Sequence, residues 1–493
     1  FFSDMAGYTE LPSESGIPWT PVLLLLLFQF CEGFAFYILA PLLPFLVQEL
    51  IPGVPLEHVG YYAGYLSSYP FLGAMIGGPL FGALSDRIGR KPVLMLGLLV
   101  PKLCLLGVFV APSFKMALGL RMLQGFFGAN NSIARTYMAE VCDTHTVARG
   151  MSLLIIPFAL AQVVAPIVGG LLSRPAEKYE VLDTELMRQY PYLLCITFPV
   201  VASAISLVLG FFLMPESHPG LKGVKAPSCP QSFDEALKEP LLSTSEKKSS
   251  FRDLVGVLST RAGLMAVVLN AMLGSIHTAF VTVFPVWVVL DAASGGYTLS
   301  ASTMGYIMAS SGPAQLLVLP VVVPFLVRKM GFRRSWALEV GLLGLVLFIT
   351  PCARELTTDP TSRLVFLAVT FCLVKVFFAI AYSNNGVFLN HAVPSTLRGV
   401  YVGMSHTIGA VFRFIVPPTA SGLFAWVSQQ EEPSWPLDYH LPFNLLGIMA
   451  VFAAAWSLFL PKSIESKYEE PAILKSLDEE EGQEPEAYPA SPL

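Results

Sequence analysis

The chain has 493 residues, of which 54% are hydrophobic and 13% are charged, and its mean hydropathy is +0.63. This composition excludes an ordinary soluble domain and is typical of a polytopic membrane protein. The net charge of −5 at pH 7 comes largely from an acidic carboxyl-terminal tail. We therefore expect the lipid bilayer, and no nucleic acid, as a partner.

The seven cysteines are scattered without paired or metal-ligand spacing, and most fall in apolar segments. Neither a disulfide framework nor a metal site is expected, and no cofactor is predicted. The sequence also contains no HExxH metal motif, no G-x-S-x-G elbow and no phosphate-binding loop. We therefore do not expect an enzyme.

Twelve apolar segments meet or approach the length of about 20 residues that a helix needs to cross the hydrocarbon core. They cover residues 21–47, 59–84, 93–111, 116–141, 147–173, 192–214, 262–290, 301–327, 335–352, 364–389, 400–427 and 441–460. The polar stretch before the first segment contains no Lys or Arg, so the first span is expected to serve as its own insertion signal.

Six spans precede and six follow a stretch that collects Pro, Gly, Ser, Lys and Glu and cannot bury a core. This predicts five parts: a cytoplasmic amino-terminal segment 1–19, a six-helix bundle 20–214, a cytoplasmic linker 215–258, a second six-helix bundle 259–461 and a disordered, acidic cytoplasmic tail 462–493. With the amino terminus in the cytoplasm, the inner loops carry most of the loop Lys and Arg, as the positive-inside bias requires.

A glycine-rich, charged turn lies between the second and third spans. Its key residues are Gly82, Asp86, Arg87, Gly89, Arg90 and Lys91. Bases beside a span hold that side in the cytoplasm, and glycines let two helices approach closely. The second half echoes this turn weakly, with Gly331 in the place of Gly89 and Arg328 in the place of Asp86.

The pattern G-x-x-x-D-R-x-G-R-K in this turn resembles the signature of major facilitator superfamily transporters. Arg121-x-x-Gln124-Gly125 resembles the fourth-helix motif of that family. Ala165-Pro166-x-x-Gly169-Gly170 resembles its fifth-helix antiporter motif, with alanine at 165 where the family usually has glycine. Shorter strings, among them Leu389-Asn390-His391-Ala392-Val393-Pro394, resemble the zinc-induced facilitator-like subgroup, near the drug:proton antiporters.

The resemblance implies an all-α membrane protein with twelve helices in two pseudo-symmetric six-helix bundles, which exposes a central site alternately to the two sides. It also implies that charged residues of the turn form a cytoplasmic gate with the end of the fourth span. The predicted gating residues are Asp86, Arg87, Arg90, Arg121 and Glu140. If the turn is only a topology signal, it has no gating role.

Charged side chains inside the spans point to a functional site, because each costs about 2.5–3.5 kcal/mol at the bilayer centre. Glu32 lies about 16 Å into the first span, and His277, Lys375 and Arg413 also fall near mid-depth. Arg135 lies nearer the cytoplasmic end of the fourth span. The family resemblance implies that the first, fourth, seventh and tenth helices line one cavity, where Glu32, Arg135, His277 and Lys375 can converge.

Glu32 and His277 are therefore predicted to serve in proton coupling. Burial raises the pKa of a carboxylate and an approaching cation lowers it, so substrate binding could expel a proton from Glu32. A histidine can titrate near neutral pH. The alternatives are a fixed salt bridge from Glu32 to Arg135 or Lys375, and a histidine that only packs. The predicted substrate-binding residues are Arg135, Asn270, Lys375, Tyr382, Asn385 and Arg413. Lys102 and Glu339 are placed nearer span ends and given a structural or exposed role.

These residues predict a secondary active transporter that works by alternating access. The predicted substrate is a small organic anion or zwitterion, a class that includes metal chelators. Proton-coupled antiport is preferred, because Glu32 lies at mid-depth and most of the antiporter-like motif is present. The alternatives are a transporter-like nutrient receptor and a facilitative uniporter without proton coupling. We expect a monomer with both termini in the cytoplasm, in the plasma membrane or in a vacuolar or endosomal membrane.

Overall fold

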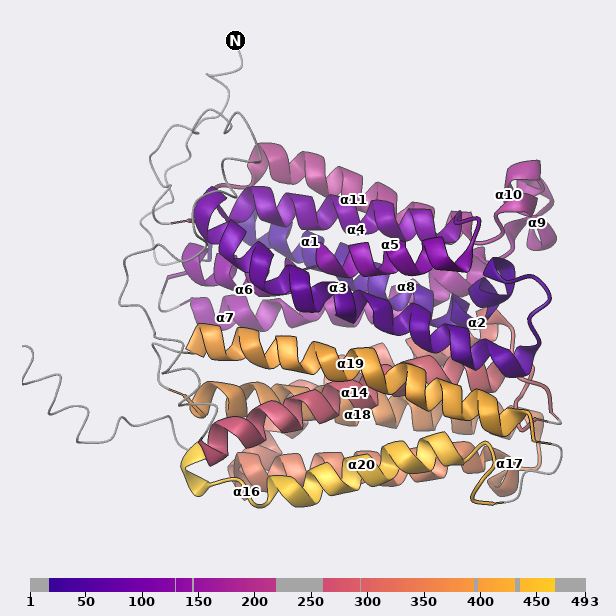
Figure 1. Ribbon diagram of the computed structural model, residues 1–493. Coiled ribbons are helices and arrows are strands. Elements are labelled where there is room, and N and C mark those ends of the chain that lie inside the picture. Colours follow the sequence, from indigo (N-terminus) through magenta and orange to yellow (C-terminus); the bar gives the residue numbers. More distant parts are fainter. Residues whose placement is uncertain are drawn as a thin grey trace, which may run out of the picture.

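The computed structural model describes residues 17–128, 130–143, 146–218, 260–292, 294–393, 398–430 and 435–465. These residues are almost entirely helical, and the long helices run side by side in two groups (Figure 1). Indigo to magenta helices form the first group, and pink to yellow helices form the second. The first group comes from the residues before the segment 219–259 and the second group from the residues after it.

The first half begins with helices that are broken at several points. Its elements are α1 (Trp19–Tyr37), α2 (Leu39–Leu50), η1 (Leu56–His58), α3 (Val59–Ile88), α4 (Arg90–Phe109), α5 (Phe114–Phe126), α6 (Asn130–Val141), α7 (Val147–Leu153), α8 (Ile155–Leu172), α9 (Pro175–Lys178), η2 (Glu180–Leu182), α10 (Glu185–Gln189) and α11 (Leu193–Leu213). The pairs α1–α2, α5–α6 and α7–α8 each correspond to one predicted span that the structure divides in two.

The second half contains longer uninterrupted helices. Its elements are α14 (Arg261–Val289), α15 (Ala301–Ala309), α16 (Ser311–Ile349), η3 (Thr350–Cys352), α17 (Ala353–Leu356), α18 (Pro360–His391), α19 (Arg398–Ser428), α20 (Leu441–Ser457) and η4 (Lys462–Glu465). A non-helical backbone at Gly331, with φ +80°, divides α16 into two spans.

Eight helical runs within the described residues are long and apolar enough by themselves to cross a membrane. One of these runs, Ala301–Leu356, holds two of the predicted spans. The three remaining predicted spans are α3, the α5–α6 pair and α20, which are less apolar or shorter. The predicted number of spans therefore matches the helices, although not every span is recognisable by length and hydropathy alone.

The two ends of the bundle differ and are named here by their connections. The linker side is the end where α11 finishes and α14 begins, and the loop side is the opposite end, which carries α9, α10 and α17 (Figure 1). On the loop side the halves pack tightly: a Cβ at Gly64 of α3 would lie 2.6 Å from Pro418 Cα of α19. Among the described residues, a Cβ at Gly82 or Gly403, toward the linker side of the same helices, would meet no atom within 4 Å. The halves are thus closed together on the loop side and less crowded on the linker side.

The glycine turns of the two halves are built alike. Gly89 has φ +101° and Gly331 has φ +80°, a left-handed backbone that disfavours a side chain. A carboxylate fills the space beside each glycine, from Glu216 after α11 and from Glu465 after α20. The weak sequence echo between Gly89 and Gly331 is therefore confirmed at the level of the backbone.

Candidate functional site

The first-half cluster of the site consists of Glu32, Lys102 and Asn130. Lys102 Nζ of α4 lies 2.5 Å from Glu32 Oε1 of α1, and Asn130 Nδ2 of α6 donates to the same oxygen at 3.1 Å. Lys102 is 1% exposed, so the lysine is a buried partner and not a residue of a span end. A charge this deep in the bilayer is tolerated because it is paired. The salt bridge of Glu32 is made with Lys102, and not with Arg135 or Lys375.

The second-half cluster consists of Lys375, His277 and Arg413. Lys375 Nζ of α18 lies 2.7 Å from His277 Nε2 of α14. An ammonium group has only donors, so Nε2 accepts and the imidazole is neutral in this arrangement. The same ammonium lies 5.3 Å from the ring centre of Tyr37, at the end of α1 in the other half. Lys375 thus contacts both halves.

Arg413 of α19 also faces the first half. Its guanidinium lies 5.8 Å from the ring centre of Phe71 of α3, and Nη2 donates to Tyr382 Oη at 3.5 Å. Within the part of the chain that the structure describes, the buried Nε of Arg413 has no hydrogen-bond partner. Among the described residues, no carboxylate oxygen lies within 4.0 Å of Arg413 or Lys375. The second-half cluster therefore has positive charge without a compensating acid.

The predicted residues Asn270 and Asn385 lie together beneath this cluster. Asn385 Nδ2 of α18 donates to Asn270 Oδ1 of α14 at 2.8 Å, and Asn270 Nδ2 donates to Ser405 Oγ of α19 at 3.0 Å. All three are buried. These hydrogen bonds connect α14, α18 and α19, and Asn385 Oδ1 has no partner among the described residues.

Glu339 of α16 is buried at 1% exposure away from any base. Its carboxylate accepts from Ser335 Oγ at 2.5 Å and from Asn384 Nδ2 at 2.8 and 3.0 Å. Neutral donors hold the carboxylate of Glu339, and its burial fits the structural role expected for it and not the exposed one. Such a group is satisfied by hydrogen bonds without an ion pair.

A cavity of about 210 Å³ separates the first-half cluster from α14. Glu32 lines it together with Phe71, Arg121 and Gln124 of the first half and Thr278 of the second. Arg121 Nη1 donates to Gln124 Oε1 at 2.6 Å, and Nε donates to Leu66 O at 2.9 Å. Arg121 therefore lines the cavity and lies apart from the other predicted gating residues.

Those other gating residues form a network on the linker side. Arg90 of α4 is paired with Asp86 of α3 and with Glu140 of α6, whose Oε1 lies 3.0 Å from Nη2. Glu216 accepts from the backbone N–H groups of Arg90 and Lys91 at 2.8 and 3.1 Å, where the helix dipole favours an anion. Arg87 is engaged in an interaction as well. The named partners of Arg90 all belong to the first half, so the network stabilises that half internally.

Arg135 is exposed and has no contact with Glu32. It lies within electrostatic range of His406 of α19, and His406 is exposed too. Two exposed groups that act on each other from opposite halves face a shared space and not lipid. Of the four residues expected to converge, the structure brings His277 and Lys375 into contact, whereas Glu32 and Arg135 lie elsewhere between the halves.

Comparison with known proteins identifies the architecture. A family model described as the Major Facilitator Superfamily matches residues 25–417. The chain belongs to the Major Facilitator Superfamily. Protein zinc induced facilitator 1 of Arabidopsis thaliana is 24% identical over 425 residues, which cover 85% of this chain and 86% of that protein. A probable peptide/nitrate transporter of the same plant is 24% identical over 426 residues, with 86% and 87% covered. The solved D-xylose–proton symporter shares the fold, with a TM-score of 0.68, 15% identity, and 92% of this chain and 100% of that chain covered.

The resemblance seen in the motifs is thus confirmed, and zinc-induced facilitators are among the relatives of this major facilitator protein. The predicted fold class, an all-α membrane protein with twelve spans, is confirmed as well. The chain is an integral, multi-pass membrane protein of a transporter family that acts on small molecules in a lipid bilayer, and not an enzyme.

The sequence did not predict several residues of this major facilitator site. The charge of Lys102 could have indicated a functional position, because Lys102 is the thirteenth residue of α4 and therefore lies near mid-depth. Asn130, Tyr37 and Phe71 gave no such signal, because none of them carries a charge whose place inside the bilayer needs an explanation. Their role depends on which helices of the two halves face each other, and the sequence does not fix that geometry residue by residue.

Proposed function

We propose that this protein transports a small organic anion, or a zwitterion through its carboxylate, by alternating access. The observation that carries the proposal is the second-half cluster: Lys375 and Arg413 lie at mid-helix, in contact with both halves, without a carboxylate within 4.0 Å among the described residues. A buried positive charge without a partner is unfavourable in the bilayer. A substrate anion would supply the missing negative charge.

The geometry suits a carboxylate or a phosphate. A planar guanidinium can bind such a group through parallel donors, and the ammonium of Lys375 adds a point charge. The rings of Tyr37 and Phe71 bring the first half against these two cations. A substrate held at this point would contact both halves and would bind differently when they move apart, which transport requires.

The first-half cluster is our candidate for proton coupling. Glu32 lines the cavity and is held by Lys102 and Asn130, so protonation of the carboxylate would release Lys102. A change of charge at the interface of the halves would favour one arrangement over the other. We assign the coupling role to Glu32, with exchange of proton against substrate. His277 accepts from Lys375 as a neutral ring, and protonation there would repel the ammonium.

Orientation follows from charge. We place the linker side, with Arg90 and Lys91, in the cytoplasm, together with both termini. The two bundles 20–214 and 259–461 would then move about the site as units within one monomer, in the plasma membrane or in a vacuolar or endosomal membrane. The name of one relative, a probable peptide/nitrate transporter, favours an anionic or zwitterionic solute.

The test is flux into sealed proteoliposomes that contain the purified full-length protein. Radiolabelled organic anions, zwitterions and cations are offered with and without an inside-acid pH gradient. We expect uptake of an anion or zwitterion, stimulated by the gradient, and its loss in Lys375→Gln but not in Lys115→Gln, whose lysine is exposed. Binding without flux would identify a receptor, and flux indifferent to the gradient would identify a uniporter.

A further inference from the structure

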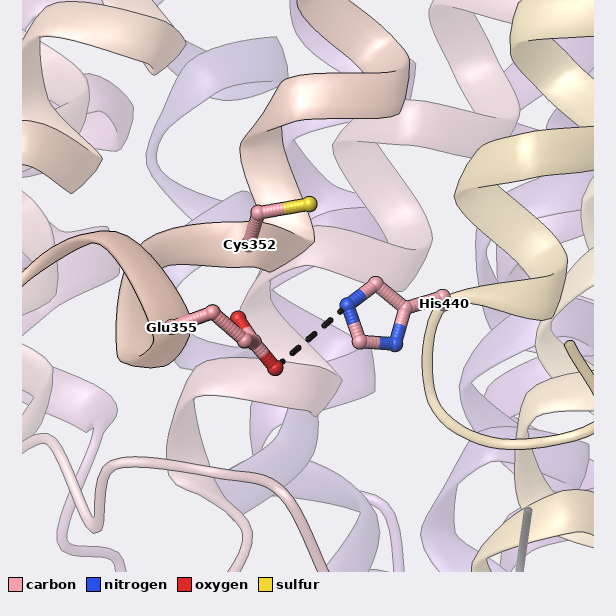
Figure 2. Close-up of side chains that lie close together, drawn as sticks. All are labelled: Cys352, Glu355 and His440. Atoms are coloured by element: carbon pink, nitrogen blue, oxygen red, sulfur yellow. Dashed lines mark ion pairs between the residues drawn. The ribbon is translucent and has the colours of Figure 1, made fainter. Parts of the chain in front are cut away.

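Three side chains with metal-binding atoms meet on the loop side of the second half. Cys352 ends η3, Glu355 lies in α17, and His440 directly precedes α20. Their sulfur, carboxylate oxygen and imidazole nitrogen all lie within 4.8 Å of one another (Figure 2). In Figure 2 the thiol, the carboxylate and the imidazole point toward a common space from three different segments.

We propose that Cys352, Glu355 and His440 bind a divalent transition metal of the zinc class, with water as the fourth ligand. Thiolate, carboxylate and imidazole are the ligands that zinc takes in proteins, and three protein ligands leave one open position. At zinc–ligand bond lengths of about 2.0–2.3 Å, neighbouring donors in a tetrahedron are about 3.3–3.7 Å apart. His440 Nε2 and Glu355 Oε1 lie 3.7 Å apart and all three donor atoms lie within 4.8 Å of one another, so each separation has to shorten when the metal binds.

The neighbours of these ligands orient them for the metal. His440 Nδ1 donates to the carboxylate of Asp438, at 2.9 Å to Oδ1 and 3.0 Å to Oδ2, which leaves Nε2 facing Glu355. A carboxylate on the far nitrogen of a ligating histidine is the usual way to fix its tautomer. The Tyr439 hydroxyl donates to Glu355 Oε1 at 2.6 Å and orients that carboxylate.

The charge of this group also favours a cation. Two carboxylates, Glu355 and Asp438, lie beside the thiol and a single histidine. The adjacent Arg354 does not turn toward them, because its guanidinium donates to the carbonyl oxygens of Ala292 and Gly296. A divalent ion would balance the negative charge that these side chains concentrate.

The site is open to the loop side. A cavity of about 800 Å³ is lined by all three ligands together with Asp438 and Asn444. The side chain of Glu355 is 50% exposed, whereas that of His440 is 9% exposed. A metal can therefore enter from the loop side without crossing the membrane. Bound there, it would join the connection between α16 and α18 to the connection between α19 and α20, within one half, apart from the proposed transport cluster.

The experiment uses the purified full-length protein in detergent, stripped with a chelator and titrated with ZnCl₂ and, separately, with CoCl₂. Zinc is expected to raise the apparent unfolding temperature, because a ligand of the native state stabilises it. Cobalt is expected to give a near-ultraviolet thiolate-to-metal band, which reports sulfur ligation directly. Cys352→Ser should lose the band and most of the zinc-dependent shift.

Cys372→Ser is the matched control, since Cys372 is a partly buried thiol of α18 outside the cluster, and it should keep both signals. Asp438→Asn should keep the band but weaken zinc binding about 10–100-fold, as expected for a residue that positions a ligand. Unfolding temperatures without metal show whether each variant is folded. The proposal is overturned if the wild-type protein gives no cobalt–thiolate band, or if Cys352→Ser and His440→Gln, folded without metal, retain the full zinc shift. Neither result would bear on the proposed transport function, which is tested separately by flux into proteoliposomes.

Discussion

The first-half and second-half clusters lie at similar depth in the membrane but differ in charge. In the first half, Glu32 and Lys102 form a closed pair of opposite charges with Asn130 as an added donor. In the second half, Lys375 contacts a neutral histidine and Arg413 contacts a phenol, with no acid nearby among the described residues. The first-half cluster satisfies its own charges, whereas the second-half cluster would be completed by the anion that we propose as substrate.

The glycine turns show the same contrast on a shared backbone. Around Gly89, Arg90 is bound by two carboxylates and Glu216 caps the next helix. Around Gly331, the described ion pair is a single one, Arg333 to Glu465 at 3.9 Å. A duplicated backbone therefore carries a dense charge network in one half and a sparse one in the other. More side-chain interactions therefore stabilise the turn of the first half than that of the second, among the described residues.

The largest effect is expected from Glu32→Gln, which breaks the closed pair and leaves Lys102 buried without a carboxylate. Removing one member of a buried pair costs about 3–5 kcal/mol of stability. We expect a clear drop in the apparent unfolding temperature and loss of proton-driven exchange in proteoliposomes. The double variant Glu32→Gln, Lys102→Met should recover the stability but not the coupling. Undiminished pH-driven flux in either variant would refute the role of Glu32.

The second effect concerns the open cluster. Lys375→Gln removes a cation that has no acid partner, so stability should be unchanged or improved, whereas anion affinity should fall. Losing one charge that binds an anion in a desolvated site costs about 2 kcal/mol or more, which is about 30-fold in affinity. Substrate-dependent thermal stabilisation and uptake kinetics measure the two quantities. If the variant were strongly destabilised and bound substrate normally, Lys375 would be a structural residue.

A third effect compares the turns directly. Alanine at Gly89 (φ +101°, ψ 163°) or at Gly331 (φ +80°, ψ 165°) forces a side chain into a backbone region that is essentially limited to glycine, at a cost of about 1–3 kcal/mol. At Gly89 the new Cβ also overlaps the Glu216 carboxylate, which is fixed by two backbone donors, whereas at Gly331 it meets Glu465 at 2.9 Å, a residue at the exposed surface. Gly89→Ala should therefore lower the unfolding temperature more than Gly331→Ala. Equal shifts would show that Glu216 yields as easily as Glu465.

Most of the fold could be predicted from the sequence, because the apolar spans and the glycine turns are local sequence patterns, even where a single span is short or less apolar. The pairing of charges could not be predicted in the same way. Lys102 meets Glu32 because α1 and α4 pack against each other. Two residues at the same depth on different helices can point toward each other or away, and the sequence does not say which. The same limit hid the group of Cys352, Glu355 and His440, which two distant connections bring together. The depth of a residue can be counted along its helix, but the neighbouring helix that its side chain faces cannot be read from the sequence.

The smallest effect is expected from Asp86→Asn in the dense turn. The side chain of Asp86 is 61% exposed, and exposed ion pairs contribute about 1 kcal/mol or less. Arg90 keeps Glu140 in the variant, so the fold and the substrate affinity should be nearly unchanged. If the network helps to hold one arrangement of the halves, its loosening shifts their balance, and turnover should change about two- to fivefold while binding does not. Transport rates and equilibrium binding on the same preparation separate these quantities. A change confined to affinity would count against a gate and would return the turn to a purely structural role in the first half.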